Sequence, residues 1–208
     1  LDVSKFFGRR VKPLANFARQ ARRIRFSENQ TFALMAIVVG LAGGLAAVGF
    51  HHLINFLSDE IFGRIAEFCE PLGKFRFLPP IMLGALLVGP LVTRAAPEAK
   101  GHGVPEVMEA VTRRGGRIRT RVAYIKAIAS ALTIGSGGSA GREGPIVQIG
   151  SAIGSTIARA FRMSDRRRST FVAAGAAAGV AAVFNAPLAG VFFALEVVLR
   201  SFTARGFS

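Results

Sequence analysis

The sequence predicts an all-α membrane protein, and three observations support this fold class. Hydrophobic residues make up 51% of the 208 residues, and the mean hydropathy is +0.42. Long uncharged runs alternate with clusters of arginine, and Gly-Pro or Gly-x-Pro pairs interrupt the runs. Because lipid offers the backbone no hydrogen-bond partner, apolar segments of this kind cross a bilayer as helices.

Residues 1–30 predict a basic amphipathic helix on the cytoplasmic leaflet. Lysine and arginine alternate there with phenylalanine, leucine and isoleucine, which is typical of a helix that lies on an anionic membrane surface. A signal peptide is not indicated, because the basic region is too long and no small-residue cleavage site follows an apolar core. The predicted organisation is therefore an N-terminal helix over 1–30 and a transmembrane region over 31–208.

Four uncharged runs cover residues 31–57, 77–93, 145–158 and 169–195. A helix needs about 20 apolar residues to cross a bilayer, so only the first and last runs are long enough. The shorter runs predict tilted, partial or re-entrant helices, which are tolerated where protein or water covers the backbone. Within the last run, the segment from Asn185 to Pro187 predicts a break into two helices.

Two arginine clusters flank the third run. The positive-inside rule places both on the cytoplasmic side, so the chain between them leaves the cytoplasm and returns as two helices. The glycine-rich stretch 135–144 joins these helices and is expected to dip into the membrane from the far side; the alternative is a flexible external loop. The clusters consist of Arg113, Arg114, Arg117, Arg119 and Arg121, and of Arg159, Arg162, Arg166, Arg167 and Arg168.

The segment GREGP at 141–145 predicts a helix that begins at Gly144 and Pro145, because proline is favoured at the first helical position. A helix N-terminus carries about half a positive charge and several free N–H groups, which makes it an anion site inside a bilayer. The segment GHGVPE at 101–106 repeats the pattern with Pro105. Two such helix starts that converge would attract anions and repel cations.

Three segments in this order resemble the CLC family of chloride channels and proton/chloride exchangers: GHGVPE at 101–106, GREGPIVQIG at 141–150 and GAAAGVAAVFNAPLAGVFFALEV at 175–197. The resemblance implies a CLC-type fold of two inverted repeats with broken helices, of which this chain holds the first. The third filter motif and the inner-gate tyrosine belong to the second repeat, so the chain is expected to be a fragment or to be completed by a second polypeptide.

The resemblance also implies a voltage-gated homodimer that transports chloride through one pathway per subunit, as a multi-pass protein of the bacterial inner membrane with a cytoplasmic N-terminus. By the same resemblance the anion site comprises Gly101, His102, Gly103, Val104, Pro105, Gly141, Arg142, Glu143, Gly144, Pro145 and Ile146.

Glu143 is the expected gate. A carboxylate is itself an anion, so deprotonated Glu143 can occupy the site that the helix amides create for chloride, and protonated Glu143 can swing away. The alternative is an ordinary salt bridge with Arg142. Arg142 is expected at the outer mouth, where its field raises the anion concentration, or as a snorkelling interface residue. Gln148 is expected to be buried and bonded across helices.

Two positions differ from the common family pattern. His102 stands where most chloride-selective members have serine, which leaves nitrate, bromide and fluoride open as substrates; the alternative is a ring turned away while backbone amides bind. Val197 follows Glu196 where many exchangers have a second, proton-relaying glutamate. The sequence therefore favours channel-like passive permeation over proton-coupled exchange, and a non-conducting scaffold is the alternative from another class. Glu196 is expected to be satisfied by nearby backbone.

Several function classes are disfavoured. No nucleophile, base and orienting group form a catalytic pattern, so an enzyme is not expected. His51 and His52 are adjacent and cannot share a helical face, so no metal and no cofactor are expected. The basic clusters lie between apolar segments, which argues against nucleic acid. Gly175 and Gly179 predict close helix packing.

Overall fold

The computed structural model describes residues 28–200, and every regular element in this range is helical. The predicted N-terminal helix over 1–30 lies almost wholly outside the described residues. The chain separates into two compact units, Leu1–Met35 and Ala36–Ser208. Only the first turns of α3 belong to the first unit among the described residues, and the elements discussed below belong to the second.

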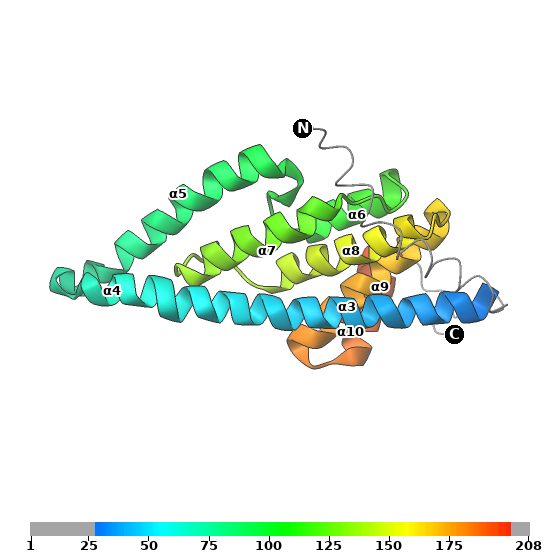
Figure 1. Cartoon of the computed structure of the whole chain (residues 1–208), viewed down its shortest axis with the longest axis horizontal. Helices are drawn as coiled ribbons and strands as arrows, with labels where there is room; N and C mark the ends of the chain where they lie inside the picture. The colour runs from blue at the N-terminus through cyan, green and yellow to red at the C-terminus, as the bar shows by residue number, and fades with distance from the viewer. Residues whose placement is uncertain (1–27, 201–208) are drawn as a thin grey trace, which may run out of the picture. The chain divides into compact units, whose positions relative to one another are not determined.

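Two long helical segments are visible in Figure 1, and both carry exposed apolar side chains. Helix α3 (Glu28–Phe56) continues through a π-helical stretch, η1 (Leu57–Gly63), into α4 (Arg64–Phe68). A 3₁₀ segment, η2 (Glu70–Phe77), leads into α5 (Leu78–Ala95). By length and composition, Gln30–Phe68 and Glu70–Ala95 can each cross a membrane. Large apolar side chains on both are exposed, among them Leu41, Leu45, Val48, Met82 and Leu86.

This result corrects the expected lengths of two runs. The run 77–93 was predicted to be too short to span, but helical structure extends it on both sides, from Glu70 to Ala95. The run 169–195 was predicted to be long enough, but it splits into α9 (Asp165–Phe184) and α10 (Pro187–Phe193). Asn185 ends α9 in the left-handed conformation at φ 51°, so the predicted break is confirmed and neither piece has the composition and length of a span.

The other helices pack around α8. They are α6 (Val104–Arg113), α7 (Thr120–Gly135), α8 (Glu143–Ala160) and α9, followed by α10 and a π-helical turn, η4 (Ala194–Val198). A short 3₁₀ turn, η3 (Pro97–Ala99), precedes α6. Helix α8 contacts α6, α7 and α9, and it lies beside α7 in Figure 1. As predicted, α7 and α8 are two helices joined by the glycine-rich stretch.

Glycine allows α8 and α9 to pack backbone against backbone. A Cβ at Gly150 would collide with the carbonyl oxygen of Gly175, and a Cβ at Gly175 would collide with that of Gly150. A Cβ at Gly179 would meet the carbonyl oxygen of Ile146 at 2.9 Å. The close packing predicted for Gly175 and Gly179 is therefore confirmed, and it buries the apolar side of α8 around Ile146.

The two arginine clusters meet at one end of this helix group. Arg168 is buried and donates hydrogen bonds to the carbonyls of Gly115 at 2.9 Å and Met163 at 3.0 Å. Ser155 on α8 accepts from the Ile118 amide at 2.9 Å and donates to the Gly116 carbonyl at 2.7 Å. These bonds hold the α6–α7 connection against α8 and the start of α9, so the clusters lie on the same side, as the positive-inside argument requires.

Candidate anion site at two helix starts

The segment before α6 makes a sharp, glycine-dependent turn. Gly101 and Gly103 have φ of 90° and 96°, a region that other residues rarely adopt. Helix α6 begins at Val104, directly before Pro105. The carboxylate of Glu106 accepts a hydrogen bond from the Gly103 amide at 2.9 Å, which is the half of a capping box that the third helical residue supplies, since glycine has no side chain for the other half.

Lys126 anchors the same turn from α7. Its side chain is buried, and Nζ donates to the carbonyls of Ala99 at 3.0 Å and Gly101 at 2.6 Å. Two carbonyl groups that would otherwise lack partners are thus satisfied by one cation. The sequence analysis did not assign Lys126 to the site. The only feature of the sequence that pointed to Lys126 was a single charge inside an apolar helix. Ionisable residues within membrane helices usually have a functional or structural role.

Helix α8 begins at Glu143, one residue before the start predicted at Gly144 and Pro145. Arg142 occupies the N-cap position, and no side chain caps this end. The first amides of a helix have no partner inside the helix. Proline has no N–H, and the Ile146 amide donates to the Arg142 carbonyl at 3.2 Å. The α8 start therefore presents the amides of Glu143 and Gly144, and no side-chain cap accepts from them.

The two helix starts touch through their glycines. A Cβ at Gly144 would overlap the carbonyl oxygen of His102, and a Cβ at Gly103 would lie 2.6 Å from the carbonyl oxygen of Gly144. Backbone approach at this distance is open only to glycine. The predicted convergence of the segments 101–106 and 141–145 is confirmed as geometry.

Glu143 has no partner among the described residues. Its side chain is exposed, and its carboxylate lies close to Gly141, where a Cβ would collide with it. Within residues 28–200 this carboxylate forms neither a hydrogen bond nor an ion pair, so the alternative of a salt bridge with Arg142 is wrong. Arg142 contacts α3 instead: its Nη1 lies 3.0 Å from Nδ1 of His51.

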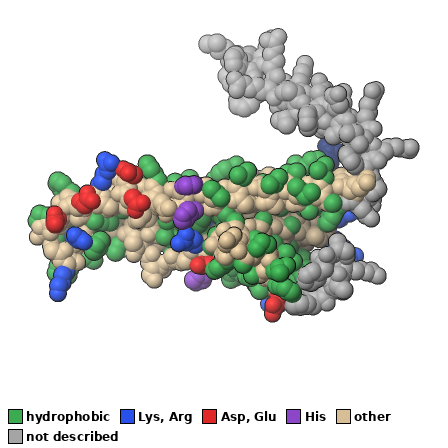
Figure 2. Space-filling model, turned by 90° about the horizontal axis from the view of Figure 1, so that it is seen from below, with side chains coloured by type: hydrophobic (Ala, Val, Ile, Leu, Met, Phe, Trp, Pro, Cys, Tyr) green, Lys and Arg blue, Asp and Glu red, His purple; other side chains and the backbone are tan. Residues whose placement is uncertain are grey.

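His51 is a site residue that the sequence analysis missed. Because a guanidinium only donates, Nδ1 of His51 accepts the hydrogen bond from Arg142, and the ring proton of a neutral His51 then lies on Nε2. Figure 2 shows histidine side chains next to basic and acidic side chains on one face of the molecule. The signal could not be local, since His51 and Arg142 are 91 positions apart.

The remaining predicted residues are only partly explained by the structure. The His102 ring is exposed and has no hydrogen bond within the described chain, whereas its carbonyl contacts Gly144. Gln148 is buried and donates from Nε2 to the Glu98 carbonyl at 2.7 Å, as predicted. Glu196 lies in the π-helical turn η4, exposed and without a hydrogen bond among residues 28–200, so its predicted backbone partner is wrong. Val197 is half-buried beside it.

Metal ligands are not grouped in this part of the chain. Among the described residues, no three side chains of histidine, cysteine, aspartate or glutamate lie together in an arrangement that could hold an ion. The groups that the site offers are therefore backbone N–H groups, the cations of Lys126 and Arg142, and the carboxylate of Glu143.

Comparisons with known proteins identify relatives of the chain. A family described as "Voltage gated chloride channel" matches residues 84–208. The H⁺/Cl⁻ exchange transporter ClcA of Klebsiella pneumoniae (strain 342) is 41% identical over 175 residues, which cover 81% of this chain and 36% of that protein. The ClcA transporter of Salmonella paratyphi B is 38% identical over 208 residues, covering 97% of this chain and 43% of that protein.

Solved structures agree with this fold. The crystal structure of a slow cyanobacterial Cl⁻/H⁺ antiporter matches with a TM-score of 0.70 at 30% identity, over 84% of this chain and 42% of that one. A eukaryotic CLC transporter matches in fold with a TM-score of 0.68 at 24% identity, over 85% of this chain and 35% of that one. The chain thus spans less than half the length of the relatives that it matches.

Proposed function

Because this chain belongs to the CLC family of voltage-gated chloride channels, we propose that it supplies one part of a chloride pathway across a membrane. The anion binds where the starts of α6 and α8 meet. Backbone amides are the ligands, and glycine at positions 103 and 144 lets the two helix starts approach closely enough to share one ion.

The observation that carries the proposal is the free Glu143 carboxylate at the uncapped start of α8. A deprotonated carboxylate competes with chloride for the same amides, and protonation removes that competition. Arg142, held by His51 at 3.0 Å, adds a positive charge next to the gate and attracts anions toward it. His102 contributes its backbone to the site, and chloride is the substrate that its relatives' names favour.

We propose that transport is coupled to protons, in place of the passive permeation that Val197 suggested. The bacterial relatives are named H⁺/Cl⁻ exchange transporters, and the cyanobacterial relative is a Cl⁻/H⁺ antiporter. Glu196 supports coupling, because it is an exposed acid directly before Val197 and has no partner among residues 28–200. Val197 itself supports the second candidate, passive conduction. Homodimer formation, voltage dependence and a bacterial inner-membrane location with a cytoplasmic N-terminus are part of the same proposal.

The test uses the complete protein in liposomes with high internal and low external chloride. Potassium and valinomycin hold the voltage near zero, so protons have no electrical driving force. Exchange predicts that chloride efflux drives proton uptake and acidifies the lumen, and that Glu143→Gln conducts chloride without moving protons. Chloride efflux without proton uptake by the native protein would establish passive conduction. Absence of both fluxes would contradict transport.

A further inference from the structure

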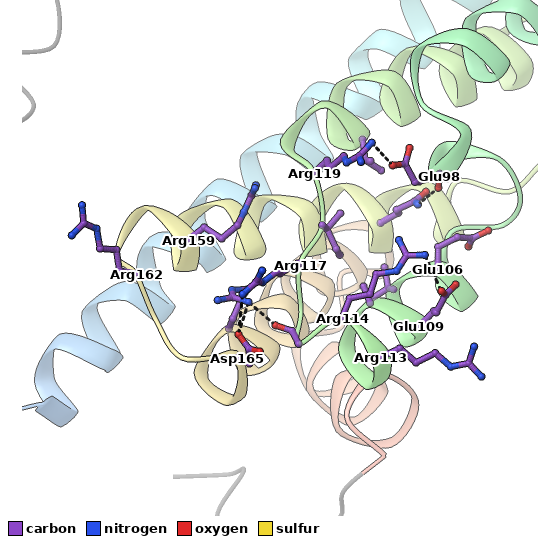
Figure 3. A pocket seen from close by; sticks show the side chains of 17 residues that line it. Glu98, Glu106, Glu109, Arg113, Arg114, Arg117, Arg119, Arg159, Arg162 and Asp165 are labelled. Carbon is purple, nitrogen blue, oxygen red and sulfur yellow. Dashed lines mark hydrogen bonds and ion pairs between the residues drawn. The ribbon is translucent and has the colours of Figure 1, made fainter.

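The end of the molecule where the two arginine clusters meet contains a charged groove. It has a volume of about 1030 Å³ and lies among the α6–α7 connection, the last turns of α8 and the start of α9. Figure 3 shows Arg114, Arg117, Arg119 and Arg159 around this groove, with Arg113 and Arg162 at its two ends. Seven arginines and four acidic residues line it, which leaves an excess of positive charge. We call it the arginine groove.

The acidic residues do not neutralise the arginine groove. Two arginines pair with acids at its edges, Arg114 with Glu109 at 2.8 Å and Arg119 with Glu98 at 3.0 Å. Arg117 approaches Asp165 only to 3.8 Å, because the same carboxylate oxygen accepts from buried Arg168 at 2.8 Å. Three arginines have no carboxylate partner among the described residues: Arg113, Arg159 and Arg162.

An apolar groove adjoins the arginine groove. It has a volume of about 400 Å³, runs between α3, α7 and α8, and is lined mainly by alanine, isoleucine, Phe50 and Leu53. Thr120 and Thr156 line the apolar groove, and both accept hydrogen bonds from Nη2 of Arg159, at 2.9 and 3.2 Å. Arg159 lines the arginine groove. The two grooves therefore meet at this arginine.

From this juxtaposition we infer that the two grooves form one binding site for an anionic phospholipid. The headgroup phosphate binds Arg159 and Arg117, and an acyl chain lies in the apolar groove. Arginine forks bind phosphate oxygens in pairs, and basic pockets on the cytoplasmic side of membrane helices suit anionic headgroups. A free phosphate would use only the charged half of the site. The inference depends on the site's membrane setting and not on whether chloride moves.

Lipid binding to the complete protein tests the inference directly. The protein is purified in an uncharged detergent, and lipid occupancy is measured by native mass spectrometry during titration. The probes are phosphatidylglycerol, phosphatidylcholine with the same acyl chains, and glycerol 3-phosphate without chains. We expect phosphatidylglycerol to bind about tenfold more tightly than phosphatidylcholine, because the choline cation offsets the charge of the phosphate and is repelled by the excess of arginine in the groove. Glycerol 3-phosphate should bind far more weakly than either lipid.

Two variants address the two halves of the site, and each has a matched control. Arg159→Gln should weaken phosphatidylglycerol about tenfold and should weaken phosphatidylcholine less, because its headgroup has no net charge. Arg159→Lys should lie between Arg159→Gln and the native protein. Arg166→Gln removes the same charge from an exposed arginine outside the groove. Gly49→Leu fills the apolar groove, where a Cβ meets nothing within 4 Å, and should weaken both lipids; Gly44→Leu is equally unhindered but does not line the groove. Thermal unfolding confirms that each variant is folded.

Three results would overturn the inference. Equal affinity for the two lipids would show that the net negative charge of the headgroup has no role. Equal loss of phosphatidylglycerol binding in Arg159→Gln and Arg166→Gln would reduce the groove to a general surface charge. Binding of glycerol 3-phosphate as tight as that of phosphatidylglycerol would make the ligand a soluble phosphate. None of these outcomes depends on chloride flux, so the inference and the proposed transport function can fail separately.

Discussion

The starts of α6 and α8 share glycine, proline and a glutamate in the first turn, but their glutamates differ in position and in role. In GVPE the glutamate follows proline, so Glu106 reaches back to the Gly103 amide at 2.9 Å and caps its own helix. In REGP the glutamate precedes glycine and proline, and Glu143 is the first residue of α8. The acid of a capping box is the third residue of its helix and binds the amide of the N-cap residue. Glu143 is the first residue of α8, so it cannot make this bond. The position of glutamate relative to glycine and proline therefore makes Glu106 a structural residue and leaves Glu143 without a partner among residues 28–200.

The difference extends to the surroundings of each helix start. The α6 turn is held from three sides, by Glu106, by Lys126 and by contact with Gly144. The α8 start is held by the same glycine contact and, through Arg142, by His51. In the proposed anion site, the α6 start is therefore the fixed side, and the α8 start carries the carboxylate that is proposed to move. The following predictions test this contrast, from the largest expected effect to the smallest.

Gly144→Ala should have the largest effect, because its Cβ would overlap the His102 carbonyl and force the two helix starts apart. We expect a loss of more than about tenfold in chloride flux and a loss of about 1–3 kcal/mol in the free energy of unfolding, as for other overpacked sites. Chloride flux and thermal unfolding measure the two effects. Gly44→Ala is the control, since its Cβ meets nothing within 4 Å. Native flux in Gly144→Ala would contradict the shared site.

Lys126→Met should destabilise the turn that precedes α6. The change leaves the carbonyls of Ala99 and Gly101 without their donor, and an unsatisfied buried group costs about 1–3 kcal/mol. We expect lower stability together with weaker chloride binding, measured by calorimetry on the complete protein. Lys100→Met removes the same charge from an exposed neighbour. Equal loss of chloride affinity in both variants would show that only net charge matters.

Glu106→Ala should remove the cap of α6 without touching the gate. The expected loss is about 1 kcal/mol in the free energy of unfolding, typical of a missing N-terminal cap. The pH dependence of chloride flux should stay that of the native protein, because the proposed gate, Glu143, is unchanged. A flattened pH profile in Glu106→Ala would mean that the two glutamates do not have separate roles.

His51→Gln should have the smallest effect, because a glutamine oxygen can still accept a hydrogen bond from Arg142. We expect chloride flux within about twofold of the native value, consistent with a single exposed hydrogen bond. His51→Leu offers no acceptor and should lower the flux further, whereas His52→Leu should not. If both leucine variants behave alike, the contact with Arg142 has no functional weight.

The sequence predicted what short segments determine and missed what distant segments bring together. The two helix starts, the break at Asn185 and the glycine packing of α8 against α9 follow from local patterns of glycine, proline and asparagine. The contact of His51 with Arg142 and the bonds of Lys126 to the α6 turn join positions 91 and 25 residues apart. The spacing of apolar residues along a helix carries no information about contacts between such distant positions.

The length of the span that contains α5 was underestimated for a related reason. Charged residues Lys74 and Arg76 bound the uncharged run, yet they lie in the 3₁₀ segment η2, which leads into α5 after a kink at Gly73. A count of uncharged residues therefore measures the apolar part of a helix, not its ends.

The central claim is that Glu143, and not Glu106, controls access to the anion site. It is tested most directly by chloride flux through the complete protein in liposomes, measured between about pH 4.5 and about pH 7.5, a range that spans the titration of a carboxyl group, for Glu143→Gln and Glu106→Gln. Neutral glutamine mimics the protonated acid, so Glu143→Gln should conduct at neutral pH as the native protein does at acidic pH, with little further pH dependence. Glu106→Gln should keep the native profile. A native pH profile in Glu143→Gln, or its loss in Glu106→Gln, would contradict the account.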